Sequence, residues 1–173
     1  SGDIKEVVRV ILDKRWISLV GPHSTPKLRR PMHFVSNILR TPGVSLLDVN
    51  SIISALDLLG QRPFGWSSPD GYPNDLETWG SGVLPRWSFA FYVFLGTLPG
   101  VAVTTGALYQ ALGSPNQSNL TARAAELLAG GNIDPDELRD IDEFVQSGAT
   151  TSGEALMRNT LALVASCPSY QYL

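Results

Sequence analysis

The longest uncharged segment of the chain sets the strongest limit on its fold. From Trp87 to Ala122 no residue carries a charge, so most of this segment must be buried in a membrane or in a protein core. Its most apolar part, WSFAFYVFLGTLPGVAVTTG, has roughly the 20 residues that cross a bilayer. Gly96, Pro99 and Gly100 divide that part into pieces too short to span. We therefore expect no membrane span and a buried helix in the core.

Apolar residues recur at helical spacing through most of the remaining chain. The spacing and the Pro and Gly breaks predict helices over about 2–16, 31–41, 47–59, 81–95, 104–112, 118–128, 134–147 and 153–166. Asp134, Pro135 and Gly148 give the clearest start and end signals. No segment alternates with a period of two, so no strand is predicted. The expected fold class is all-α, a compact bundle of seven or eight short helices that forms a single domain over 1–173.

Residues 61–80 do not share this helical pattern. The segment QRPFGWSSPDGYPNDLETWG holds three prolines and four aromatic residues. A loop of this length inside a compact domain is uncommon unless it is functional or packs on itself. We therefore predict one long ordered loop that lies over the core.

Acidic and aromatic side chains within this loop are of the types that form sugar-binding sites. Aromatic rings stack on sugars, and carboxylates bind hydroxyl groups or act as acid and base. The alternative is that the rings hold the loop on the core while the acids cap turns. Both interpretations remain open for the residues concerned: Trp66, Asp70, Tyr72, Asp75, Glu77 and Trp79.

A basic group surrounds the helix predicted from residue 31. Lys27, Arg29 and Arg30 precede it, and Arg40 ends it. Such a group could bind an anion. His33 lies within the helix, where a histidine on the surface or partly buried is the ordinary finding.

Arg86 stands alone in an apolar helix, between Pro85 and Trp87. An arginine in such a place needs a partner, so we expect a structural pairing with a carboxylate or with backbone carbonyls of the loop.

Several functional classes find no support in the sequence. The formal net charge of −3 gives no broad positive field for nucleic acid, so no nucleic-acid partner is expected. His23, His33 and the single Cys167 show no metal-ligand spacing, and we expect neither metal nor cofactor. Nucleophile-elbow, phosphate-loop and dinucleotide motifs are also missing from the sequence.

Three motifs occur in an order typical of one known family. They are TPKLRRPMHFVSNILR, then ALDLLGQRPFGWSSPDGYPNDLETWGSGVLPRWSFAF, then LMRNTLALVASCPSYQYL. Together they resemble the C-terminal half of the "domain of unknown function 1800" family, over nearly the whole chain. Residues 97–150 carry the least of the likeness. The matching positions are Lys27, Arg30, Pro31, Phe34, Arg40, Gly60, Gln61, Phe64, Pro69, Gly71, Pro73, Trp79, Arg86 and Phe89.

The chain also departs from the family pattern. His33 stands where the family usually has glutamate, Tyr72 replaces a tryptophan, Ser88 replaces an asparagine, and Cys167 precedes Pro168. A histidine in place of glutamate reverses the charge expected there, so an activity that depends on that carboxylate would be missing. The resemblance implies a helical fold in a mostly bacterial, often exported protein, and it implies no reaction. It further implies that this chain is the C-terminal part of a longer protein.

Three functions follow as hypotheses. The first is a binding module of an exported protein, engaging polysaccharide or a partner protein through residues 61–80 and 27–40. The second is a hydrolase acting on carbohydrate or ester with the loop carboxylates. The third is a structural domain that packs on a missing N-terminal half and exposes apolar surface along 2–16 or 89–94. The candidate binding residues are Lys27, Arg30, His33, Arg40, Gln61, Trp66, Asp70, Tyr72, Trp79 and Arg86.

Overall fold

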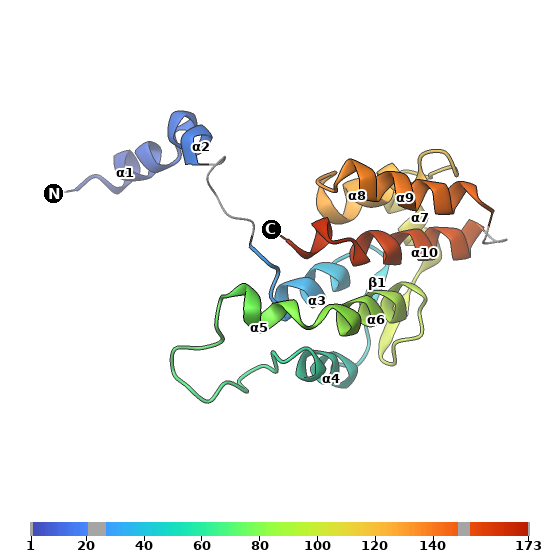
Figure 1. The fold of residues 1–173 in the computed structure, drawn as a ribbon, viewed down its shortest axis with the longest axis horizontal. Helices are drawn as coiled ribbons and strands as arrows, with labels where there is room; N and C mark the ends of the chain where they lie inside the picture. Colours follow the sequence, from blue (N-terminus) through green and yellow to red (C-terminus); the bar gives the residue numbers. More distant parts are fainter. Residues whose placement is uncertain (1, 21–26, 149–152, 173) are drawn as a thin grey trace.

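The described chain is largely helical, which confirms the predicted fold class (Figure 1). The computed structural model describes residues 2–20, 27–148 and 153–172. The helices are α1 (Ile4–Ile11), α2 (Lys14–Val20), α3 (Pro31–Leu39), α4 (Asn50–Leu58), α5 (Leu76–Gly80), α6 (Val83–Phe94), α7 (Thr105–Ala111), α8 (Leu120–Ala129), α9 (Pro135–Gln146) and α10 (Gly153–Ser166). A 3-10 turn at Ser169–Gln171 follows α10.

Helix α10 lies at the centre of the fold. It packs against α6 on one side and against α8 and α9 on the other, while α3 packs on α6 (Figure 1). The uncharged segment supplies much of this core, as predicted, since Phe89, Val93 and Phe94 of α6 are buried. In the described part of the chain no helix is both long enough and apolar enough to cross a membrane.

A short sheet corrects the prediction of a fold without strands. β1 (Val44–Leu46) and β2 (Val101–Val103) pair antiparallel, with Val44 opposite Val103. Each strand has three residues, which is too short for a period of two to show in the sequence. The connection continues beyond the strands, because the amides of Leu47 and Asp48 both donate to the carbonyl of Gly100, at 2.7 and 3.0 Å.

One helix prediction and the loop prediction were also wrong in detail. The helix expected over 2–16 is two helices, because Asp13 accepts a hydrogen bond from the backbone N–H of Arg15 at 2.9 Å and begins α2. Within 61–80 the expected loop contains α5, which Asp75 caps by accepting from the Thr78 amide at 2.8 Å.

Helices α1 and α2 present their apolar residues to solvent. No residue of α1 is buried, and both helices lie apart from the helical body (Figure 1). The exposed apolar side chains on them and between them are Ile4, Val7, Val8, Val10, Ile11, Leu12, Trp16, Ile17 and Leu19. The alternative location for an exposed face, 89–94, is mostly buried.

Replacing Gly100 with alanine is expected to destabilise the protein by about 1–3 kcal/mol. Gly100 has a φ of +74°, and an added Cβ would lie 2.8 Å from the Cβ of Asp48. The midpoint of urea unfolding measures the loss. Gly71→Ala is the matched control, since Gly71 has a φ of +76° but open space around an added Cβ. Equal losses in the two variants would contradict the role of the close contact.

Candidate binding site

Three aromatic rings order the loop at residues 61–80. The ring centroids of Trp66 and Tyr72 are 5.0 Å apart, and those of Tyr72 and Trp79 are 5.9 Å apart. Tyr72 donates to the Arg62 carbonyl at 2.7 Å, and the Trp79 indole donates to the Pro73 carbonyl at 3.0 Å. Trp79 is only 4% exposed and anchors the row of rings in the core. At the other end Trp66 is 42% exposed, so the row leads from the core to solvent.

Phe64 is the most exposed aromatic residue of the loop. Its side chain is fully exposed to solvent, and its φ is +57°. A left-handed backbone is unfavourable for a residue with a Cβ, and an exposed phenylalanine ring leaves apolar surface in water. A neighbouring turn holds this conformation, since the Gly65 amide donates to the Arg62 carbonyl at 3.0 Å.

The carboxylates of this loop serve its internal structure. Hydrogen bonds from Ser68 first, and also from Trp66, lower the pKa of Asp70. Hydrogen bonds from the Thr78 amide and hydroxyl lower the pKa of Asp75. Both carboxylates therefore stay ionised at neutral pH and accept bonds from the loop. Glu77 lies in the first turn of α5 and is exposed.

The basic segment, residues 27–30, contacts the end of the chain. Leu28 and Tyr172 form an isolated β-bridge, and the Arg29 amide donates to the Gln171 carbonyl at 2.7 Å. The Arg29 guanidinium lies 4.4 Å from the Tyr170 ring centroid and donates to the Tyr172 carbonyl at 2.9 Å.

Arg30 precedes α3, His33 lies in its first turns, and both belong to one electropositive region. Partial desolvation, and then the positive charges of Arg30, Lys27 and Arg29, lower the pKa of His33 below 6.5. Within the described residues no group of three or more His, Cys, Asp or Glu side chains is placed to hold a metal ion. His23 lies outside the described residues.

Arg86 is buried without the carboxylate or loop carbonyl that we expected. It is 2% exposed, and its Nη1 donates to Gln171 Oε1 at 3.3 Å. Its guanidinium lies 5.4 Å from the Phe34 ring centroid. Burial lowers its pKa to about 10, and Nη2 meets no hydrogen-bond acceptor in the described part of the chain. The partner of Arg86 is instead an amide side chain, which keeps the charge in place without neutralising it.

Gln61 joins the basic segment to the loop. Its buried side-chain oxygen accepts from the backbone N–H of Met32 at 2.7 Å. The backbone N–H of Gln61 donates to the Leu56 carbonyl at 2.8 Å. The start of the loop therefore meets the first turn of α3, where Arg30 and His33 lie. Arg40 is separate, because it caps the opposite end of α3.

The cations of this region form no ion pair with another described residue. Described salt bridges lie elsewhere, such as Arg139–Asp136 and Arg158–Glu154. Among the residues that the structure describes, none of the basic side chains around α3 pairs with a carboxylate: Lys27, Arg29, Arg30 and Arg40. Their positive charge is left for a partner or for solvent.

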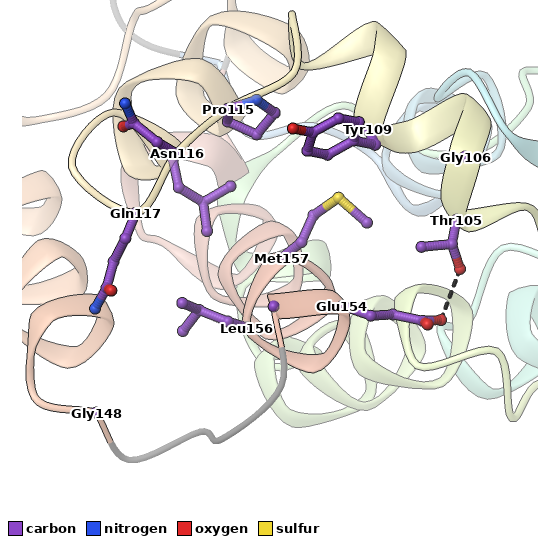
Figure 2. Close-up of a pocket in the computed structure, with 12 residues that line it drawn as sticks. Thr105, Gly106, Tyr109, Pro115, Asn116, Gln117, Gly148, Glu154, Leu156 and Met157 are labelled. Carbon is purple, nitrogen blue, oxygen red and sulfur yellow. Dashed lines mark hydrogen bonds between the residues drawn. The ribbon is translucent and has the colours of Figure 1, made fainter.

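One cavity was missed by the sequence analysis. It has a volume of about 560 Å³ and lies among α7, the turn that precedes α8, and α10 (Figure 2). Its lining residues come from distant parts of the sequence, mostly from the region that carried the fewest motifs. Helical periodicity marks such residues only as core, so no local signal could have found the cavity.

Comparison with known proteins places the chain in a family. The family model described as "Protein of unknown function (DUF1800)" matches residues 1–172. The chain belongs to this family. No curated protein and no solved structure matches it. Membership confirms the resemblance drawn from the three motifs, and the description of the DUF1800 family assigns no reaction.

We expect the NMR-titrated pKa of His33 to lie below 6.5 and to rise in Arg30→Gln, because loss of a nearby positive charge makes protonation easier. A His23→Gln background leaves one histidine signal to follow. Folding disfavours the protonated ring, so the His33 contribution lowers stability as the pH falls through 6.5.

Arg40→Gln is the matched control for this titration, since Arg40 lies at the far end of α3. The pKa of His33 should not change in this variant. A pKa at or above 6.5, or equal shifts in the two variants, would contradict the electropositive region around the start of α3.

Proposed function

We propose that this DUF1800 chain is a binding module of a longer, exported bacterial protein. Residues 61–80 form its binding surface, and the main ligand is the surface of another protein or of the rest of the same precursor. Export and the longer precursor rest on the family resemblance alone. The proposal assigns no catalytic step to the chain.

Phe64 is the observation that carries this proposal. An apolar ring held in full contact with water, on a backbone of unfavourable φ, costs stability in the free protein. Strained, exposed positions of this kind are concentrated at binding sites. Trp66 adds a half-exposed ring two residues away, and aromatic residues dominate the energetic centres of protein interfaces.

The basic residues before α3 supply charge near the start of the loop. Gln61 brings the loop against the start of α3, where Lys27 and Arg30 carry no ion pair within the described residues. An acidic group on the partner would complete this side of the interface. The proposed partner surface is therefore apolar at its centre and acidic at one edge.

The state of the loop carboxylates weighs against the hydrolase alternative. A general acid needs a raised pKa, whereas hydrogen bonds lower the pKa of Asp70 and Asp75. Both carboxylates also hold the loop in shape. Arg86, the buried cation, contacts Gln171 and Phe34 rather than these acids.

The structural alternative has its own observation, the exposed apolar side chains of α1 and α2. A stripe of this kind is a contact surface that lacks its partner in this chain. We include it in the proposal as a second contact with the rest of the precursor.

Polysaccharide is the second candidate ligand of the loop. The ring of Trp66 is partly exposed, and its side chain contributes to the lowered pKa of the Asp70 carboxyl, a combination that suits a sugar ring with its hydroxyl groups. Phe64 favours the protein ligand over this candidate, because a sugar gains less from an isolated apolar ring.

Photo-crosslinking tests the protein ligand. With p-benzoylphenylalanine at position 64 of the full-length protein, expressed in its own cells, mass spectrometry should identify one crosslinked peptide. Retention of that partner by the isolated chain should fall at least about tenfold in Phe64→Ala, because interface energy is concentrated in a few aromatic anchors.

The matched control places the crosslinker, and separately alanine, at Tyr92. This half-exposed ring lies on α6, outside the loop. Crosslinks from position 64 that are no more specific than those from position 92 would contradict the protein ligand. Affinity electrophoresis in gels that contain soluble polysaccharides then tests polysaccharide as the ligand. Loss of the retardation of the protein in Trp66→Ala, but not in Tyr92→Ala, would support it.

A further inference from the structure

We propose that the cavity of Figure 2 is a binding site for an uncharged, mainly apolar small molecule that donates a hydrogen bond to Glu154. Its volume of about 560 Å³ lies within the range of small-molecule sites. The site is independent of the proposed function of the loop. In Figure 1, α8 and α9 lie on one side of α10, whereas α3 and α6 lie on the other, with α5 leading into the start of α6 and α4 beyond them.

Apolar side chains form most of the wall. Tyr109 and Pro115 lie on one side of the cavity and Met157 faces them from α10 (Figure 2). Leu120 and Leu156 extend this apolar surface and are buried. A ligand with an apolar body would therefore bury its surface here without displacing a polar group.

One wall of the cavity, the turn before α8, is held by bonds that do not depend on a ligand. The backbone N–H of Asn116 donates to Asn119 Oδ1 at 2.9 Å, and the backbone N–H of Asn119 donates to Asn116 Oδ1 at 3.1 Å. The Gln117 side chain donates to the Val145 carbonyl at 2.7 Å. These bonds fix the turn before α8, so this wall of the cavity needs little rearrangement on binding.

Glu154 gives the cavity its polar end. Its Oε1 accepts from Thr105 Oγ1 at 2.6 Å, as Figure 2 shows, and from Arg158 Nε at 3.0 Å. Those bonds lower the pKa of Glu154, so the group is a carboxylate that can only accept. Oε2 accepts no bond from the described residues, and this oxygen is available to a ligand hydroxyl or N–H.

Arg158 sets the charge of the ligand. Its side chain is 13% exposed and pairs with Glu154, while its other nitrogens donate to the carbonyls of Phe94 and Val103 at 2.8 and 3.3 Å. Glu154, whose side chain is 55% exposed, is thus already paired with a cation of the protein. A charged ligand would gain little from this ion pair and would lose hydration on entering an apolar cavity, so an uncharged donor fits best.

N-Phenyl-1-naphthylamine is a suitable probe, because it is apolar, uncharged at neutral pH and has one N–H. We expect its fluorescence to rise on binding. The chain has two methionines, Met32 and Met157, so ¹³C-methyl labelling gives two signals. The ring current of the bound dye should shift the Met157 methyl signal and leave that of Met32, on α3, in place.

Gly106→Leu tests the location of the bound dye. Gly106 lines the cavity, has no left-handed φ, and has nothing within 4 Å of an added Cβ. Leucine at this helical position is compatible with folding and should weaken dye binding at least about tenfold by occupying the cavity. Gly80→Leu is the matched control, since Gly80 has the same open space in α5, away from the cavity.

Three results would overturn this proposal. The first is no fluorescence rise up to the solubility limit of the dye, and the second is an equal shift of both methionine signals. The third is an equal loss of affinity in Gly106→Leu and Gly80→Leu. A shift confined to Met157, together with loss of affinity in Gly106→Leu alone, supports the site.

Discussion

The burial of Arg86 is the interaction on which the arrangement of the chain depends. A buried guanidinium loses its hydration, and no carboxylate of the described residues restores that energy. Two weaker contacts offset the loss, the Gln171 side chain and the face of the Phe34 ring. Both partners must be in place together, so α6, α3 and the end of the chain are joined at one point.

This junction extends outward through further contacts. Gln171 also donates to the Ala165 and Cys167 carbonyls, at 3.0 and 3.3 Å, which ties the last turn to α10. Tyr170 packs edge-on against Phe34, with ring centroids 5.9 Å apart, and accepts from Asn37 at 2.9 Å. The position of α3 that results sets the place where Gln61 begins the aromatic loop. The loop is thus positioned by the core rather than by its own sequence alone.

The sequence predicted most of the fold and less of the candidate site. Apolar spacing located the buried helices, and Asp134 followed by Pro135 predicted the start of α9 correctly. The two strands were missed because three residues cannot show a period. The sequence predicted Asp13 inside a helix, because apolar spacing gives no sign of the local turn in which Asp13 caps α2.

Site chemistry was harder to predict, because it depends on contacts between distant residues. Tyr72, Trp79 and the two loop aspartates could be grouped from the sequence, and the structure does bring the rings together. The partner of Arg86 could not be predicted, since Gln171 lies 85 positions away. The cavity at α7 and α10 was missed for the same reason, because Thr105 and Glu154 meet only in the folded chain.

Hydrogen exchange in the free protein tests most directly whether residues 61–80 form an ordered binding surface. The Trp79 indole N–H and the Gly65 amide, which donate to the Pro73 and Arg62 carbonyls, should exchange at least about a hundredfold more slowly than in an unstructured peptide. The amide of Gly65 is the more demanding of the two, because it adjoins the exposed Phe64. Exchange of both groups at the rate of an unstructured peptide would contradict a preformed surface.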